Sequence, residues 1–114
     1  MYSIGVDLGG TNIAVGIVDE KYKIIKKDSC PTLAERAAEE IIKDMAALCK
    51  RLCEEVGTDI LSVGGVGIAC PGTVNPDTGY VEYANNIKFF DFPLVELFSK
   101  YSGVEKSKIT IGND

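Results

Sequence analysis

The first residues that could do chemistry form the stretch Asp7-Leu8-Gly9-Gly10-Thr11 near the start of the chain. Apolar residues alternate with small or polar ones on both sides of it, as they do in β-strands. Two glycines between strands suit a tight hairpin that needs positive φ. Such a turn can also offer backbone amides and the Thr11 hydroxyl to phosphate oxygens, which a Cβ on either glycine would crowd. By itself the stretch fits either a plain β-turn or a phosphate-binding hairpin.

The elements that position this stretch can be predicted from the apolar pattern. Three strands in a meander open the chain, and a turn at residues 19–21 precedes the third. They are marked by Ile4, Val6 and Leu8, by Ile13, Val15 and Ile17, and by residues 22–27. The Gly9-Gly10 turn therefore joins the first strand to the second.

A long helix is predicted over residues 33–56, because apolar residues recur there every three or four positions. Thr32 is placed to cap its first turn, with Glu35 three residues later as in a capping box. Gly57 follows the last apolar residue and ends the helix.

The remaining residues predict further strands, a hairpin and a second helix. Residues 60–69 carry little polar content, which favours a central strand buried on both faces and ended by Pro71-Gly72. Strong turn residues at 75–79 predict a short hairpin, and residues 85–91 look irregular. A helix over residues 92–101 and a strand over residues 108–111 complete the predicted order.

Composition limits the classes of function. The chain has 114 residues, 46% of them hydrophobic, and a net charge of −5, which suits one soluble domain with a core of useful size. No basic stripe exists to bind nucleic acid or an anionic membrane, so a bound polyphosphate would need backbone amides and a metal ion. No leader precedes Ile4 and no apolar run approaches ~20 residues, which favours a cytoplasmic protein.

The four cysteines, Cys30, Cys49, Cys53 and Cys70, are interpreted as reduced core thiols rather than as disulfide or metal ligands. Cys49 and Cys53 could face one ion from the predicted helix, but two thiolates do not complete a zinc site, and the chain has no histidine.

Two other nucleotide-binding motifs are excluded. The segment from Gly65 to Cys70 has cysteine where a dinucleotide fingerprint needs its third glycine, and Pro71 follows where a helix should begin. No GxxxxGK[ST] sequence occurs, which rules out a P-loop.

Four segments in order carry a family resemblance. VDLGGTNIAVGIVD resembles the first phosphate-binding hairpin of the superfamily of actin, sugar kinases and heat-shock chaperones, and specifically of the ROK family. GVGIACPGTVNPDTGYV, NNIKFFDFPL and the final Gly112-Asn113-Asp114 resemble later ROK segments. The resemblance implies an α/β fold of the actin-like ATPase and ribonuclease H-like kind, with a mixed sheet flanked by helices.

The resemblance also implies the site residues. Asp114 is the expected catalytic base, and Gly72, Asn86 and Asn113 are expected to bind the sugar together with it, with Asn85 as a neighbouring candidate. The phosphate-binding residues are expected to be Asp7, Gly9, Gly10, Thr11 and Asn12. Asp7 would hold Mg²⁺ through water, because a carboxylate that touched phosphate directly would be repelled.

By the same resemblance, residues 1–114 are the N-terminal lobe of a two-lobed, ATP-dependent glucokinase or related hexose kinase of carbohydrate metabolism and glycolysis. The second lobe, with its structural zinc and adenosine site, is absent from these residues, and the full-length protein is expected to be a homodimer. The alternatives are the sugar-sensing domain of a ROK transcriptional repressor and a non-catalytic sugar-binding fragment. The hexose and the phosphoryl donor stay open among these expectations.

Overall fold

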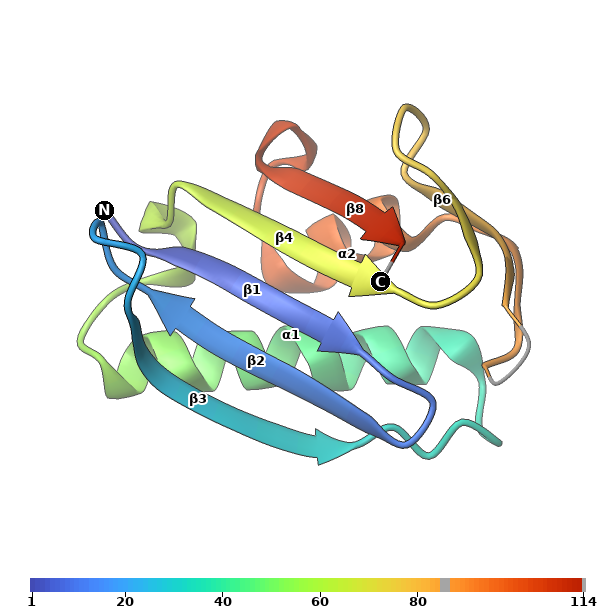
Figure 1. Ribbon diagram of the computed structural model, residues 1–114, viewed down its shortest axis with the longest axis horizontal. Helices are drawn as coiled ribbons and strands as arrows, with labels where there is room; N and C mark the ends of the chain where they lie inside the picture. The colour runs from blue at the N-terminus through green and yellow to red at the C-terminus, as the bar shows by residue number, and fades with distance from the viewer. Residues whose placement is uncertain (85–86, 114) are drawn as a thin grey trace.

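The computed structural model describes residues 1–84 and 87–113, which form a five-stranded sheet, a three-stranded sheet and two helices (Figure 1). The large sheet has the order β3-β2-β1-β4-β8, and the small one has the order β5-β6-β7. The bounds are β1 Ser3–Leu8, β2 Asn12–Val18, β3 Ile24–Pro31, α1 Ala38–Glu55, β4 Gly65–Cys70, β5 Thr73–Asn75, β6 Tyr80–Ala84, β7 Phe89–Phe92, α2 Leu94–Ser102 and β8 Ile109–Asn113.

The large sheet is mixed, as expected. The meander pairs β1 with β2 and β2 with β3 in antiparallel fashion, whereas β4 runs parallel to both β1 and β8. The carboxyl ends of β1, β4 and β8 therefore meet at one edge of the sheet. The first hairpin turn and the loop after β4 lie at this edge (Figure 1).

Both helices lie on the same side of the large sheet (Figure 1). Alternate strand residues such as Ile4, Val6 and Leu8 are buried on that side, where α1 and α2 pack against each other. Gly5 and Asp7 lie on the opposite face, which no described element covers. The helices of this chain thus flank one face and leave the other open.

The strand expected over residues 60–69 is shorter and only half-buried. Residues Ile60–Ser62 form a 3₁₀ turn, and the Asp59 carboxylate accepts a hydrogen bond from the Leu61 amide at its start. The strand proper, β4, lies inside the sheet as expected, but only alternate residues are buried. The prediction of two buried faces was wrong because Gly65, Gly67 and Ala69 give the open face little polar character without being buried.

Helix α1 begins at Ala38, five residues later than expected. The Thr32 side chain does not cap it, because its hydroxyl donates instead to the backbone of the first hairpin. Ala37 precedes the helix without a side-chain cap, so the predicted capping box was wrong. The predicted end was correct, since α1 stops at Glu55 and Gly57 has φ 82°.

Two further element boundaries differ from those predicted, one because of a turn and the other because of strand pairing. The third strand begins later than expected and continues to Pro31, after a turn in which Tyr22 has φ 63°. The stretch expected to be irregular contains β7, which pairs with β6. The hairpin around residues 75–79 and helix α2, which ends at a left-handed Gly103, are confirmed.

All four cysteines are free thiols, as expected. Burial raises the pKa of the Cys49 thiol above its usual range, so it stays protonated. Among residues 1–84 and 87–113 no group of three or more metal-ligating side chains gathers, and no described helix is long and apolar enough to cross a membrane.

Candidate active site

The turn between β1 and β2 is closed by a hydrogen bond from the Gly9 amide to the Asn12 carbonyl, 2.9 Å long. A Cβ on Gly9 would lie 3.0 Å from that same carbonyl oxygen, which is tighter than most Cβ contacts in proteins and would force the turn to shift. The expectation of positive φ was wrong, because neither Gly9 nor Gly10 is among the glycines with positive φ. Gly9 therefore serves the turn through its small size, and its amide is already used.

Gly10 and Thr11 occupy the tip of this turn. No hydrogen bond to another residue of the described ranges engages the amide of either one. Thr11 and the following Asn12 are exposed, and Gly10 is half-buried. Among the described residues, two backbone amides and one hydroxyl are thus without partners at the carboxyl end of β1, and successive donors of this kind can bind phosphate oxygens.

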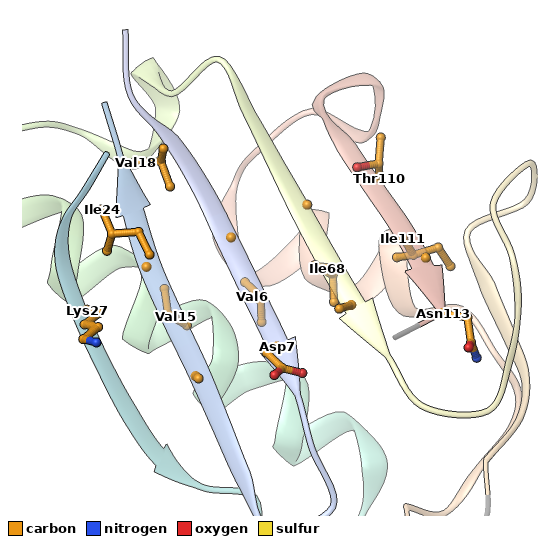
Figure 2. A pocket seen from close by; sticks show the side chains of 16 residues that line it. Val6, Asp7, Val15, Val18, Ile24, Lys27, Ile68, Thr110, Ile111 and Asn113 are labelled. Carbon is orange, nitrogen blue, oxygen red and sulfur yellow. The ribbon is translucent and has the colours of Figure 1, made fainter. Parts of the chain in front are cut away.

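Asp7 stands on the open face of the sheet, two residues before the turn (Figure 2). It lies opposite Ala14 on β2 and Ala69 on β4, whose short side chains leave the carboxylate accessible. One carboxylate fits an ion that keeps most of its waters, as Mg²⁺ does.

A shallow trough of about 620 Å³ runs over this open face. Asp7 near one end and Lys27 on β3 are its charged lining residues, and Asn113 also borders it (Figure 2). One row across its floor has no side chains, because Gly5, Gly16 and Gly67 pair opposite one another on three adjacent strands.

The loop after β4 is held against β6 and β8. Gly72 has φ 85°, and a Cβ there would lie 2.0 Å from the Tyr83 carbonyl oxygen, so only glycine fits. The Asn113 side-chain amide donates a hydrogen bond to the Gly72 carbonyl. The requirement for glycine at this position is therefore internal packing.

The structure brings part of the expected site together. Asp7 pairs with Ala69, which pairs with Gly112, so two strand spacings, about 10 Å, separate Asp7 from the residue before Asn113. The expected ligands Asn86 and Asp114, together with Asn85, lie outside the described residues.

Sequence reasoning missed Thr32 as a contact of the turn. Thr32 is fully buried, and it donates hydrogen bonds to the carbonyls of Gly9 and Thr11. The pattern offered no signal beyond a threonine at a predicted helix start, where capping is the usual role.

Comparison with known proteins identifies the family. Residues 3–114 match the ROK family. The chain belongs to the ROK family. It is 34% identical over 112 residues to a glucokinase of Thermotoga maritima, covering 97% of this chain and 33% of that protein. A glucokinase of Streptomyces coelicolor is 37% identical over 94 residues, covering 82% of this chain and 27% of that protein.

Solved ROK structures share the fold. The ROK glucokinase of Streptomyces griseus, in complex with glucose and AMPPNP, superposes with a TM-score of 0.83 at 32% identity, covering 99% of this chain and 33% of that one. The ROK hexokinase of Thermus thermophilus superposes with a TM-score of 0.82 at 27% identity, covering 99% of this chain and 35% of that one. The expected actin-like ATPase fold is confirmed by these sugar kinases.

A ROK transcriptional regulator, a homologue of the Escherichia coli MLC protein, also superposes with a TM-score of 0.82, but at 14% identity it shows the fold alone. This ROK chain spans about a third of the length of the curated relatives that it matches.

Proposed function

We propose that residues 1–114 are the sugar- and phosphate-binding lobe of a kinase that transfers the γ-phosphoryl group of ATP to the 6-hydroxyl of glucose or a related hexose. One observation carries the proposal: the Gly10 and Thr11 amides are free of described partners at the sheet edge where Asp7 and Asn113 also lie. The glucokinase relatives and the glucose complex of the Streptomyces griseus enzyme support this reaction.

The turn fits the phosphate groups of ATP. Its two amides and the Thr11 hydroxyl are donors, and residues 9–12 themselves contain no carboxylate. Asp7 would hold a hydrated Mg²⁺ through its one carboxylate. When bound, the ion would neutralise the charge that spreads over the transferred group.

For the sugar, we propose Asp114 as the base that accepts the proton of the attacking hydroxyl. Asn86 and Asn113 would hydrogen-bond the other hydroxyls, and the loop at Gly72 would form the adjoining wall. Such a reaction depends mainly on positioning and electrostatic stabilisation, so rigid attachment of these residues matters.

The assignment to the first of two lobes is part of the proposal. The zinc and the homodimer expected from the resemblance stay predictions, and so does the cytoplasmic location expected from the apolar pattern of the sequence. A sensor of the repressor type would need sugar binding without either the phosphate turn or the base, so nucleotide binding separates the two functions.

The test joins residues 1–114 to the remaining two thirds of the Thermotoga maritima glucokinase. ADP release is measured with glucose, ATP and Mg²⁺, beside the 114-residue chain alone. We expect turnover from the joined protein and none above ~1 s⁻¹ from the chain alone, because one lobe leaves ATP in open water. If the joined protein folds and binds glucose but does not bind ATP, the result would contradict the kinase assignment and favour a sensor.

A further inference from the structure

Thr32 contacts the phosphate turn, which comprises residues 9–11 between β1 and β2 and is named for its proposed role. It follows the last residue of β3 and is completely buried. Its Oγ1 donates to the Gly9 carbonyl over 2.7 Å, and its backbone amide donates to the Thr11 carbonyl over 2.8 Å. Two carbonyls of the turn are therefore fixed by one residue that follows β3.

Fixing the Gly9 carbonyl also fixes the Gly10 amide. The two groups belong to one planar trans peptide, so they point in opposite directions. Because the carbonyl is directed at buried Thr32, the Gly10 N–H is directed away from it. This amide is one of the two that carry the proposed phosphate contact. If the Thr32 hydroxyl is removed, the only remaining restraint on this peptide plane among the described residues is the turn hydrogen bond of the neighbouring Gly9 amide.

Thr32 is itself attached to helix α1. The Arg36 Nε donates to the Thr32 carbonyl over 3.0 Å, and Nη1 of the same guanidinium pairs with Asp44 over 2.7 Å. Its Nη2 is buried without a hydrogen-bond partner among the described residues. The contacts run from the turn through Thr32 and Arg36 to the first two turns of the helix.

We propose that Thr32 is a positioning residue for phosphoryl-donor binding: its hydroxyl orients the Gly10 amide toward the phosphates. This inference rests on the proposed function. It concerns a residue that contacts neither ligand and acts only through the Gly9–Gly10 peptide. The simpler possibility is that Thr32 only stabilises the fold, and the test must separate the two roles.

The experiment uses the ¹⁵N-labelled joined protein described above, in which a second lobe completes residues 1–114, and follows the Gly10 and Thr11 amides by NMR during titration with MgATP and with magnesium tripolyphosphate. Thr32→Val removes the hydroxyl at nearly constant volume, and Thr32→Ser retains it. Thr58→Val is the matched control, a half-buried threonine that no hydrogen bond among the described residues joins to residues 9–12. Melting temperatures are recorded for every variant.

We expect Thr32→Val to weaken both ligands about tenfold, the ratio that corresponds to about 1.4 kcal/mol. Thr32→Ser should stay within about twofold of wild type, even where its melting temperature falls, and Thr58→Val should bind normally. If Thr32→Val does not fold, Thr32→Ala replaces it as the variant without a hydroxyl.

Three results would overturn the inference. Equal binding by wild type and the folded hydroxyl-free variant would refute it and leave the proposed function intact. If Thr32→Ser bound the ligands more weakly in proportion to the fall in its melting temperature, Thr32 would have only a stabilising role. If the wild-type Gly10 and Thr11 amides did not shift with either ligand, the proposed phosphate turn would fail, and the role of Thr32 with it.

Discussion

The side-chain amide of Asn113 donates to the backbone carbonyl of Gly72, 41 residues earlier in the chain. This bond joins the end of β8 to the loop that leaves β4. Both residues are expected at the sugar site, so the loop and the strand that would present the sugar ligands are fixed to each other. Asn113 thus has a structural task in addition to its proposed contact with sugar.

Gly72→Ala should destabilise the fold strongly. The new Cβ would meet the Tyr83 carbonyl oxygen at 2.0 Å, at a φ of 85° that L-residues rarely adopt. We expect a loss of more than about 2 kcal/mol in the free energy of unfolding, measured by urea denaturation. Gly5→Ala is the control, since its Cβ would meet nothing within 4 Å. Similar losses in both variants would contradict the packing explanation.

Asp114→Asn should lower kcat by roughly 10²-fold or more in the protein completed by a second lobe, the scale of a lost general base. Glucose affinity should change little, because the amide retains most hydrogen-bonding capacity. Steady-state kinetics and glucose titration measure the two quantities separately. Near-normal turnover would remove Asp114 from the role of base.

Gly10→Val should raise the KM for ATP or abolish activity in the same protein, because the branched side chain would occupy the space proposed for a phosphate group. The glucose dissociation constant should stay near that of wild type. Joint loss of ATP binding, glucose binding and melting temperature would instead support a plain structural turn.

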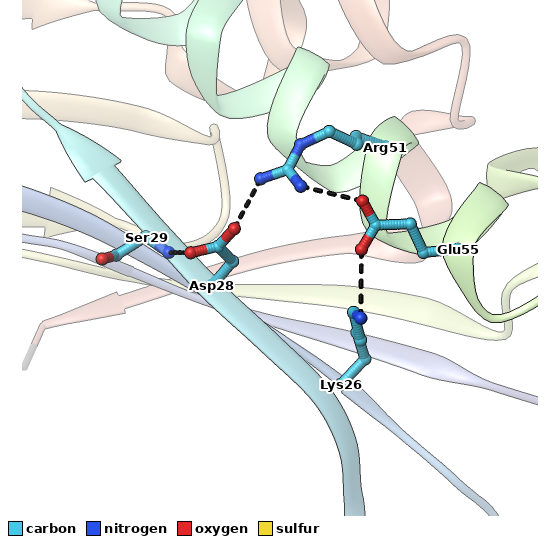
Figure 3. A network of polar contacts seen from close by, with 5 residues as sticks. All are labelled: Lys26, Asp28, Ser29, Arg51 and Glu55. Carbon is cyan, nitrogen blue, oxygen red and sulfur yellow. Dashed lines mark hydrogen bonds and ion pairs between the residues drawn. The ribbon is translucent and has the colours of Figure 1, made fainter.

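An exposed ion-pair network attaches the edge strand β3 to helix α1 (Figure 3). Arg51 bridges Asp28 and Glu55, and Glu55 also pairs with Lys26. The Arg51 hydrogen bond, followed by the Ser29 amide, lowers the pKa of Asp28 below its ordinary 3.8, and Lys26 followed by Arg51 lowers that of Glu55 below 4.5.

Lowered carboxyl pKa values set the direction of a pH dependence. Their contribution to stability is complete above the ordinary pKa values and is lost as the pH falls through the lowered ones. The protection of the β3 amides against hydrogen exchange, relative to the intrinsic exchange rate at each pH, should therefore fall below about pH 4, and should fall less in Arg51→Gln, which begins with a weaker attachment. High salt at pH 7 should mimic part of the loss, since these charges are exposed. An identical acid response in both proteins would show that the network does not hold the strand.

Local patterns predicted most elements but not their long-range exceptions. The first hairpin, the apolar stripe of α1 and the turn at residues 75–79 follow from nearby residues alone. The start of α1 was wrong because Thr32 bonds to Gly9, 23 positions away, and no local rule contains that contact. The open face of β4 was missed because glycine and alanine count as apolar whether or not they are covered.

The site was predictable only as far as its motifs. Asp7, Gly10, Thr11 and Asn113 lie at one sheet edge because parallel strands bring their carboxyl ends together, and their binding roles stay predictions. The role of Gly9 could not be read from the motif, since its amide closes the turn. Thr32 and Arg36 stayed hidden because their partners are mostly backbone atoms.

The parallel pairing of β1 with β4 has a kinetic consequence. Ser3 pairs with Gly65, about 60 residues later, whereas β2 meets its neighbours through short turns. Distant pairs pay a larger loop-closure entropy, so the meander should form before β4 docks. Pulse-labelled hydrogen exchange during refolding should protect β2 before β4, and simultaneous protection would contradict this order. Until β4 arrives, one edge of β1 would be an open template for a strand from another chain, so dilute refolding should give the highest yield.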